Sequence, residues 1–163
     1  YFDQDSIMES RNQIYAKYMN ILKGMFKASY ESKGIKASGK WGESLATFIN
    51  GDSVGVTAEF NSSIMISKGR KAGSYSNIDA LKEWIRVKEG LPQAFKNNPD
   101  KFAFIIARNH FKNGVKIPNK YNKGKVLSEP LDEFIREHLP KMWSELGESY
   151  FFNLKEDITS ILR

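Results

Sequence analysis

Apolar residues recur at helical spacing near both ends of the chain. The first stripe follows Ser6, a residue type that caps helices, and predicts a helix from Ser6 to about Tyr30, within residues 1–31. A second stripe keeps nearly one face across residues 129–162 and predicts one long helix there. Pro140 should kink this helix rather than end it, because the stripe resumes in phase beyond it. Such a helix would reach roughly 45 Å, which favours packing against another protein.

Between these two stripes, the spacing of apolar residues is no longer helical. Asn50-Gly51-Asp52 is a strong hairpin signal, and Val54 and Val56 after it alternate with polar residues or glycine. A further turn at 61–63 precedes the apolar run Ile64-Met65-Ile66. We therefore predict two or three short antiparallel strands within residues 44–67.

Two helices are predicted within residues 77–113. Ser76-x-x-Asp79 resembles a capping box and predicts a helix from about Asn77 to Lys88. Its expected buried side chains are Ile78, Leu81, Trp84, Ile85 and Val87. The second helix opens at Pro99-Asp100 and closes at Asn113-Gly114, with an expected core of Phe104, Ile105, Ala107 and Phe111.

The segments 32–42 and 115–126 lack a period and are predicted to be loops, the first containing a Trp41 that needs a pocket. Together the elements predict a single α+β domain over residues 1–163. It combines a small antiparallel sheet flanked by helices with a long N-terminal helix and a long, kinked C-terminal helix. A length of 163 residues suffices to bury such a core without disulfides or metals.

The formal charge of +6 is distributed unevenly. Basic residues outnumber acidic ones from Lys71 to Lys125, whereas acidic residues dominate from Glu129 to Asp157. A basic middle beside an acidic segment is compatible with nucleic-acid binding and with head-to-tail contact between copies of one chain. Solvated faces without a partner are the third interpretation.

The sequence contains no recognisable catalytic or metal-binding constellation. Cys is absent, which excludes disulfides, thiolate zinc sites and cysteine nucleophiles and favours a reducing compartment. The two histidines, His110 and His138, have no partner pattern, so we interpret both as structural imidazoles. Glu133 and Glu137 share a helix face that Lys141 interrupts, which indicates surface ion pairing. We expect no enzyme activity, no catalytic residue, no cofactor and no metal.

No apolar run approaches the ~18 residues of a membrane span, so we expect no membrane contact. The opening YFDQDS lacks an initiator Met and signal-peptide character, and we expect the start to be trimmed.

Two basic stretches are candidate binding sites. The first is a glycine-punctuated turn ahead of the 77–88 helix, formed by Lys68, Gly69, Arg70, Lys71 and Gly73. It is not a Walker loop, because only three residues separate its glycines and no Lys-Ser/Thr follows, although its cations could hold an anion near a helix N-terminus. The second is a flexible loop that could contact nucleic acid through Lys112, Lys116, Lys120, Tyr121, Lys123 and Lys125.

Residues 60–140 resemble the tail-completion and head–tail connector proteins of tailed bacteriophages, the lambdoid gene-ten-like minor tail family. The resemblance lies in "ISKGRKAGSYSNIDALKEWIRVKEG", "KFAFIIARNHFKNGVKI" and "LSEPLDEFIREHLPKMW". The positions that match the family's turn and its two following helices are Gly69, Arg70, Gly73, Ile78, Leu81, Trp84, Ile85, Ala103, Phe104, Ile106, Ala107, Arg108 and Gly114. The chain departs from the family at Ala72, where proline is common, and at Tyr75-Ser76, which replaces a usual proline pair.

The resemblance implies a non-enzymatic virion protein that joins the portal-proximal neck to the tail as part of a ring, assembled in the host cytoplasm. Its implied partners are copies of itself and neighbouring portal, neck or tail proteins, with non-specific DNA contact conceivable. In that setting Arg70 and Lys71 are expected to project toward a neighbouring subunit from a turn that Gly69 and Gly73 make tight. The alternative function is a basic, sequence-independent nucleic-acid-binding protein.

Overall fold

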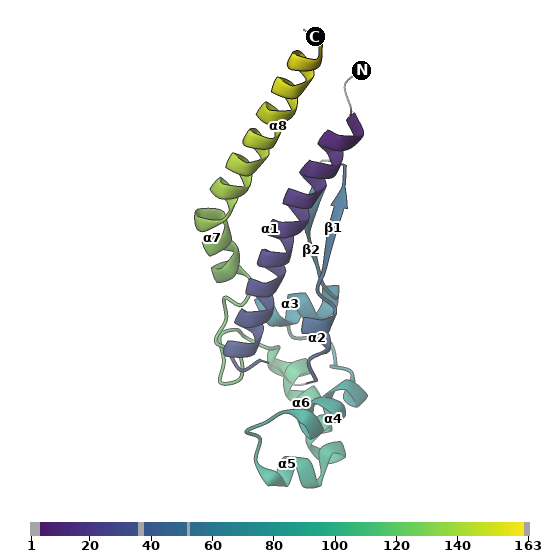
Figure 1. Ribbon diagram of the computed structural model, residues 1–163. Helices are drawn as coiled ribbons and strands as arrows, with labels where there is room; N and C mark the ends of the chain where they lie inside the picture. The colour runs from purple at the N-terminus through teal and green to yellow at the C-terminus, as the bar shows by residue number, and fades with distance from the viewer. Residues whose placement is uncertain (1–3, 36–37, 52, 162–163) are drawn as a thin grey trace. The chain divides into compact units, whose positions relative to one another are not determined.

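The computed structural model describes residues 4–35, 38–51 and 53–161, which adopt an α+β fold with one two-stranded antiparallel sheet (Figure 1). This confirms the predicted fold class and the long N-terminal helix. Residues 1–3, 52 and 162, which belong to predicted elements, lie outside the described residues. In chain order the elements are α1 (Gln4–Ser32), α2 (Lys40–Glu43), β1 (Ala46–Asn50), β2 (Ser53–Thr57), α3 (Phe60–Lys68), α4 (Ile78–Val87), α5 (Gln93–Asn97), α6 (Pro99–Asn113), α7 (Ser128–Glu137) and α8 (Leu139–Ile161).

The contacts within the chain divide it into two compact units, each built from segments that are separate in sequence. Unit 1 combines residues 1–27, 45–57 and 127–163, and unit 2 combines residues 28–44 and 58–126. The prediction of a single domain stays a prediction, because compact units of one chain can belong to one domain.

The core of unit 1 forms around α1. The apolar stripe of this helix buries Tyr18, Met19 and Leu22 against Phe134 of α7 and against Met142 and Leu146 of α8. Val54 and Val56 of β2 pack on the same cluster, so α1 lies between the hairpin and the C-terminal helices (Figure 1). Ser6, expected to cap the helix, lies inside it, since the described part of α1 already begins at Gln4.

The predicted hairpin is present, with β1 paired to β2 from Ala46↔Thr57 to Asn50↔Ser53. The ring of Phe48 covers Gly55 on the opposite strand, where a Cβ atom would lie 2.8 Å from the ring. The predicted third strand is wrong, because Ile64-Met65-Ile66 lie in α3. The carboxylate of Glu59 accepts hydrogen bonds from the amides of Asn61 and Ser62, at 3.0 and 2.6 Å, and so caps this helix. A run of three apolar residues carries no period that separates helix from strand.

The C-terminal stripe is divided between two helices. The kink predicted at Pro140 appears as a one-residue interruption at His138, between α7 and α8. A proline ring clashes with the carbonyl four residues earlier and offers no N–H, which disfavours a continuous helix just ahead of Pro140. His138 still donates its amide to Phe134 and accepts from that of Met142, both at 2.9 Å.

In unit 2, Ile85 of α4 and Ala103 of α6 share one core cluster with Leu91, which follows α4. The predicted ranges of both helices hold, but their caps and faces differ from expectation. Asn77 caps α4 by accepting the amide of Ala80 at 3.1 Å, so the capping box predicted at Ser76 is wrong.

The predicted core of α6 is wrong except at Ala107. Ala103 and Ala107 are fully buried, whereas Phe104, Ile105 and Phe111 are 53%, 48% and 37% exposed. On α4, Val87 is likewise exposed rather than buried. The small side chains of Ala103 and Ala107 let α6 lie close to α4. The prediction instead took mainly larger apolar residues of α6 as its buried face.

The segment 32–42 was predicted to be a loop, but its end forms the start of the short helix α2. Trp41 in this segment is buried, as predicted. The indole N–H of Trp41 donates to the hydroxyl of Ser63 at 2.9 Å, and its ring lies 4.9 Å from that of Tyr30. Segment 115–126 is a loop, as predicted.

Candidate functional site

The positive charge of unit 2 comes from two segments that contain no acidic residue, 60–78 and 101–126. They carry ten of the unit's seventeen Lys and Arg residues, while its remaining residues hold seven basic and seven acidic side chains. We call these two segments the acid-free region. Unit 2 has a formal charge of +10, whereas unit 1 has eight basic against twelve acidic residues, a formal charge of −4.

Hydrogen bonds join the two halves of the acid-free region. Arg70 and Val115 exchange both backbone hydrogen bonds, at 2.9 and 2.8 Å. The amide of Gly73 donates to the carbonyl of Phe111, and the side-chain amide of Asn122 donates to the carbonyl of Ile66, both at 2.8 Å. The glycine turn and the lysine loop, separate candidates in the sequence, therefore belong to one surface.

Two glycines make this pairing possible. Gly69 and Gly114 both have positive φ, at 75° and 67°. A Cβ atom on Gly69 would collide with the carbonyl oxygen of Val115, and one on Gly114 with that of Arg70. Gly73 also has positive φ, 102°, but faces open space, so its role is to turn the chain. The tight turn expected at Gly69 and Gly73 is confirmed.

Arg70 does not project from this turn as expected. Its guanidinium donates to the hydroxyls of Ser76 and Ser74, at 3.0 and 2.8 Å, and to the carbonyl of Tyr75 at 2.6 Å. These contacts hold the segment that leads into α4. Lys71 is exposed and forms no ion pair with a described residue.

The buried hydroxyl of Ser76 links Arg70 to His110. Because it accepts a hydrogen bond from Arg70, its own proton is available for Nδ1 of His110, 2.7 Å away. Burial, and then the charge of Arg70, lower the pKa of His110, which favours a neutral imidazole. The described residues give Nε2 of His110 no hydrogen-bond partner, so no third group orients this ring for catalysis. This geometry favours a structural role for the pair.

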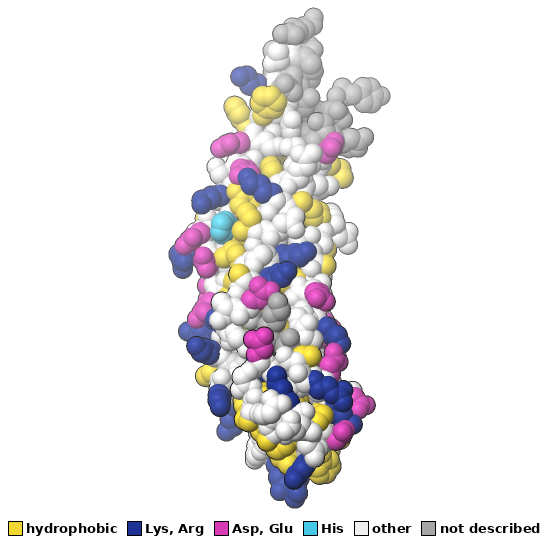
Figure 2. Space-filling model, turned by 60° about the horizontal axis from the view of Figure 1, so that its bottom comes forward, with side chains coloured by type: hydrophobic (Ala, Val, Ile, Leu, Met, Phe, Trp, Pro, Cys, Tyr) yellow, Lys and Arg dark blue, Asp and Glu magenta, His cyan; other side chains and the backbone are white. Residues whose placement is uncertain are grey.

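The lysines and aromatic rings of the acid-free region face solvent. Seven exposed lysines in it form no ion pair with a described residue: Lys68, Lys71, Lys101, Lys112, Lys116, Lys120 and Lys123. Tyr75, 53% exposed, stacks on Phe111 with ring centres 4.5 Å apart. The ammonium of Lys120 lies 5.6 Å from the ring centre of the exposed Tyr121. Lys and Arg side chains gather at the lower end of the view in Figure 2.

A second surface lies on α8, in unit 1. The outer side of this helix presents Trp143, Tyr150, Phe151 and Leu154, which are 59%, 49%, 70% and 48% exposed. With Gly147 their spacing is i, i+4, i+7, i+8 and i+11, which places them on one side of the helix. We call these five residues the α8 stripe. The prediction of one apolar stripe across residues 129–162 did not separate these exposed residues from the buried ones. Four aromatic residues within positions 143–152 are more than one buried face accommodates, and that excess was the available signal.

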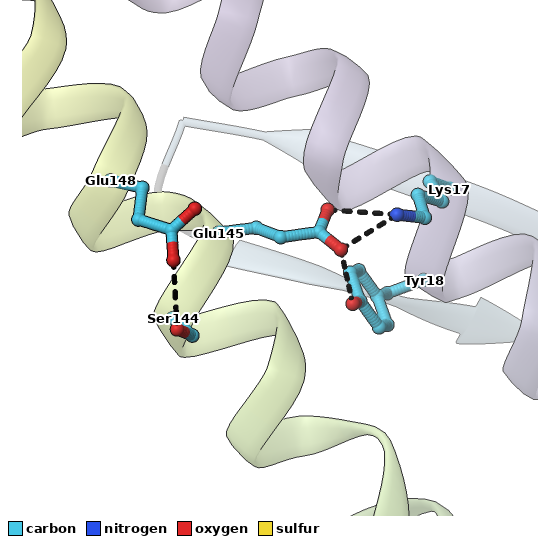
Figure 3. Close-up of polar contacts among 5 residues, drawn as sticks. All are labelled: Lys17, Tyr18, Ser144, Glu145 and Glu148. Carbon is cyan, nitrogen blue, oxygen red and sulfur yellow. Dashed lines mark hydrogen bonds and ion pairs between the residues drawn. The ribbon is translucent and has the colours of Figure 1, made fainter.

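Polar contacts fix which way α8 faces (Figure 3). The carboxylate of Glu145 accepts from the ammonium of Lys17 at 2.7 Å and from the hydroxyl of Tyr18 at 2.8 Å. The hydrogen bond from Lys17, followed by that from Tyr18, lowers the pKa of Glu145. The hydroxyls of Ser10 and Ser149 meet at 2.7 Å farther along the same two helices. With this side held against α1, the α8 stripe remains uncovered by the described residues.

Unit 1 also has a shallow, open hollow of about 570 Å³ on α1 and β1, lined by Met8, Glu9, Asn12, Gln13, Ala16 and Ile49. Nothing in this lining suggests acid–base chemistry. Within the described part of the chain, no group of three or more His, Asp and Glu side chains could hold a metal ion. No helix formed by the described residues is both long and apolar enough to cross a membrane.

No protein-family model matches the chain, and comparison with curated proteins and with solved structures gave no match either.

Proposed function

We propose that this protein is a non-enzymatic structural protein that associates with copies of itself, at the head–tail junction of a tailed bacteriophage. The observation that carries the self-association is the α8 stripe, a row of large apolar side chains on a helix whose opposite side is already packed. Monomeric proteins rarely leave such a contiguous apolar patch exposed without a partner.

The glycine at position 147 is further evidence that another protein surface covers the α8 stripe. A glycine inside a helix costs about 0.5–1 kcal/mol relative to alanine. A Cβ atom at Gly147 would meet no atom of the chain within 4 Å, so nothing inside the described structure requires a glycine there. The missing side chain instead lets a neighbouring backbone approach the helix closely between Trp143 and Tyr150.

A second copy is the occupant that unit 1 itself suggests. The shallow hollow of unit 1 lies on α1 and β1, and Met8, one of its lining residues, is 50% exposed. Unit 1 thus carries both the apolar α8 stripe and a partly apolar hollow. An α8 stripe that enters the hollow of the next copy forms a heterologous contact. Repeating this contact builds a ring when the rotation between successive copies closes the assembly.

The phage setting comes from the resemblance of residues 60–140 to tail-completion and connector proteins. It predicts that the protein occupies the neck or tail junction of the virion. Immunogold labelling of purified particles tests this placement, and label absent from the neck would refute it.

Self-association is tested on the purified full chain by light scattering after size exclusion, with negative-stain microscopy. We expect an oligomer that Phe151→Ser converts to monomer with unchanged circular dichroism. Phe152→Ser is the matched control, since Phe152 is 60% exposed but lies outside the stripe. A wild-type monomer at every concentration, or equal effects of the two variants, would refute the proposal.

Cysteine cross-linking tests the geometry, because the chain contains no cysteine. A stripe-to-hollow contact predicts disulfide-linked oligomers when Tyr150→Cys and Gln13→Cys are combined, and none with either change alone. Cross-linking by Tyr150→Cys alone would instead indicate stripe-to-stripe pairing and overturn the ring geometry.

A further inference from the structure

We infer that the acid-free region binds the phosphate backbone of a nucleic acid without reading its base sequence. This inference concerns unit 2 and does not depend on the self-association proposed for unit 1.

The first argument is uncompensated charge. The acid-free region spans 45 residues and would hold about five acidic side chains at the chain's own frequency of 19 in 163, yet it holds none. Its ten basic residues account for the whole net charge of unit 2. A surface with this charge attracts a polyanion and releases the counterions condensed on it.

The second argument is preorganisation. The Arg70–Val115 pairing and the Gly73–Phe111 hydrogen bond bring the turn that carries Lys68 and Lys71 alongside the segment that carries Lys112 and Lys116. Folding, rather than binding, thereby supplies the ordering of the backbone. Arg70 is committed to Ser74, Tyr75 and Ser76, so the phosphate contacts fall to the exposed lysines.

The third argument is the aromatic content of the same region. Tyr75 is exposed and stacked on Phe111, and Tyr121 is exposed beside Lys120. Exposed rings among cations provide stacking platforms for unpaired bases, and such stacking tolerates any base. Lysine is a point charge that suits backbone contact and lacks the fork-like geometry with which arginine reads guanine.

Fluorescence anisotropy tests the inference with labelled single-stranded DNA, double-stranded DNA and RNA of unrelated sequences, titrated over a range of NaCl concentrations. The variant replaces Lys112, Lys116, Lys120 and Lys123 by Ala. The control replaces Lys27, Lys96, Lys141 and Lys155 by Ala, which changes the net charge equally but lies outside the acid-free region.

We expect wild type to bind all sequences, with log K falling linearly against log salt. Four lost phosphate contacts should flatten this slope by about 3, since each contributes about 0.7–0.9. The control should retain most of the slope. Tighter binding to single strands would indicate that Tyr75 and Tyr121 stack on bases, and Tyr121→Ala should then remove that preference.

Absence of binding at low salt, or equal losses in variant and control, would overturn the inference. If the lysine variant instead loses self-association while nucleic-acid binding is unchanged, the lysines contact an acidic protein surface and the inference is wrong. Phe151→Ser separates the two proposals, because it should abolish self-association and leave an intrinsic nucleic-acid affinity measurable. Binding that disappears with Phe151→Ser would contradict a site contained within unit 2.

Discussion

Ser76 and His110 are hydrogen-bonded at 2.7 Å, which joins the segment before α4 to the last turn of α6. Ser76 was expected to cap α4, but Asn77 takes that role and leaves the Ser76 hydroxyl between Arg70 and His110. The pair lies inside the acid-free region, so the protonation of His110 affects how firmly the two segments are held together.

The lowered pKa of His110 predicts a loss of stability in mild acid. Above about pH 6.5, the ordinary pKa of histidine, the imidazole is neutral in both folded and unfolded chains and adds no pH dependence. Below it the unfolded chain binds a proton that the folded chain resists, because burial and Arg70 disfavour the cation. The free energy of unfolding should then fall by at most about 1.4 kcal/mol per pH unit, until the folded pKa is reached.

Urea denaturation at pH 7.5 and pH 5.5 measures this loss. His110→Asn keeps an acceptor for Ser76 but cannot be protonated, so it should reduce the difference between the two pH values. The same difference between the two pH values in His110→Asn and wild type would show that His110 is not responsible.

Alanine at Gly69 or Gly114 should break the pairing within the acid-free region. Each side chain would collide with a backbone oxygen at a φ that L-residues rarely adopt. We expect each variant to lose about 1–3 kcal/mol in urea denaturation. Gly24→Ala is the control, because its Cβ has open space inside α1 and should stabilise the protein by about 0.5–1 kcal/mol. Unchanged stability of Gly114→Ala would contradict the observed backbone geometry.

Gly147→Ala should separate folding from association. The substitution should raise the free energy of unfolding of the dissociated chain by about 0.5–1 kcal/mol, as Gly24→Ala does, because both glycines lie inside helices. Only Gly147→Ala should weaken the oligomer, since its methyl group would hold the approaching neighbour away. Sedimentation velocity over a concentration series compares the oligomers of the two variants. Equal stability of both oligomers would show that Gly147 does not lie at the interface.

A buried and an exposed leucine of α8 should differ in their contribution to stability. Leu146 is 4% exposed in the core of unit 1, and Leu154 is 48% exposed on the α8 stripe. We expect Leu146→Ala to cost about 2–5 kcal/mol and Leu154→Ala less than about 0.5 kcal/mol in the dissociated chain. Chemical denaturation of a monomeric background such as Phe151→Ser gives the comparison. A similar cost at both positions would mean that the orientation of α8 on α1 is wrong.

Elements with a clear period or a specific turn residue were predictable from the sequence. The long stripe of α1, the Pro99 start and Gly114 end of α6, and the Asn50-Gly51 turn of the hairpin each carry a local signal. The helix α3 was mistaken for a strand because Glu59, its capping residue, is not among the usual N-cap types. On α6 the buried face follows the two alanines at 103 and 107, since α4 approaches closely there.

The candidate surfaces were predictable only in part. Positive φ at Gly69 and Gly73 and the loop character of 115–126 follow from composition. The partner of Arg70 lies 45 positions along the chain at Val115, and no local pattern indicates such a pairing. Arg70 was expected to project toward a neighbouring subunit, because a sequence does not show which cations its own serines and carbonyls engage.

The chain passes between the two units four times, after Lys27, Ser44, Thr57 and Val126. Neither unit is therefore a continuous stretch of sequence, and no single truncation yields either one intact. A protease that nicks one crossing leaves fragments that each retain pieces of both units. Synthesis of unit 1 is complete only after all of unit 2 has emerged from the ribosome, so the last helices must find a partner made more than a hundred residues earlier.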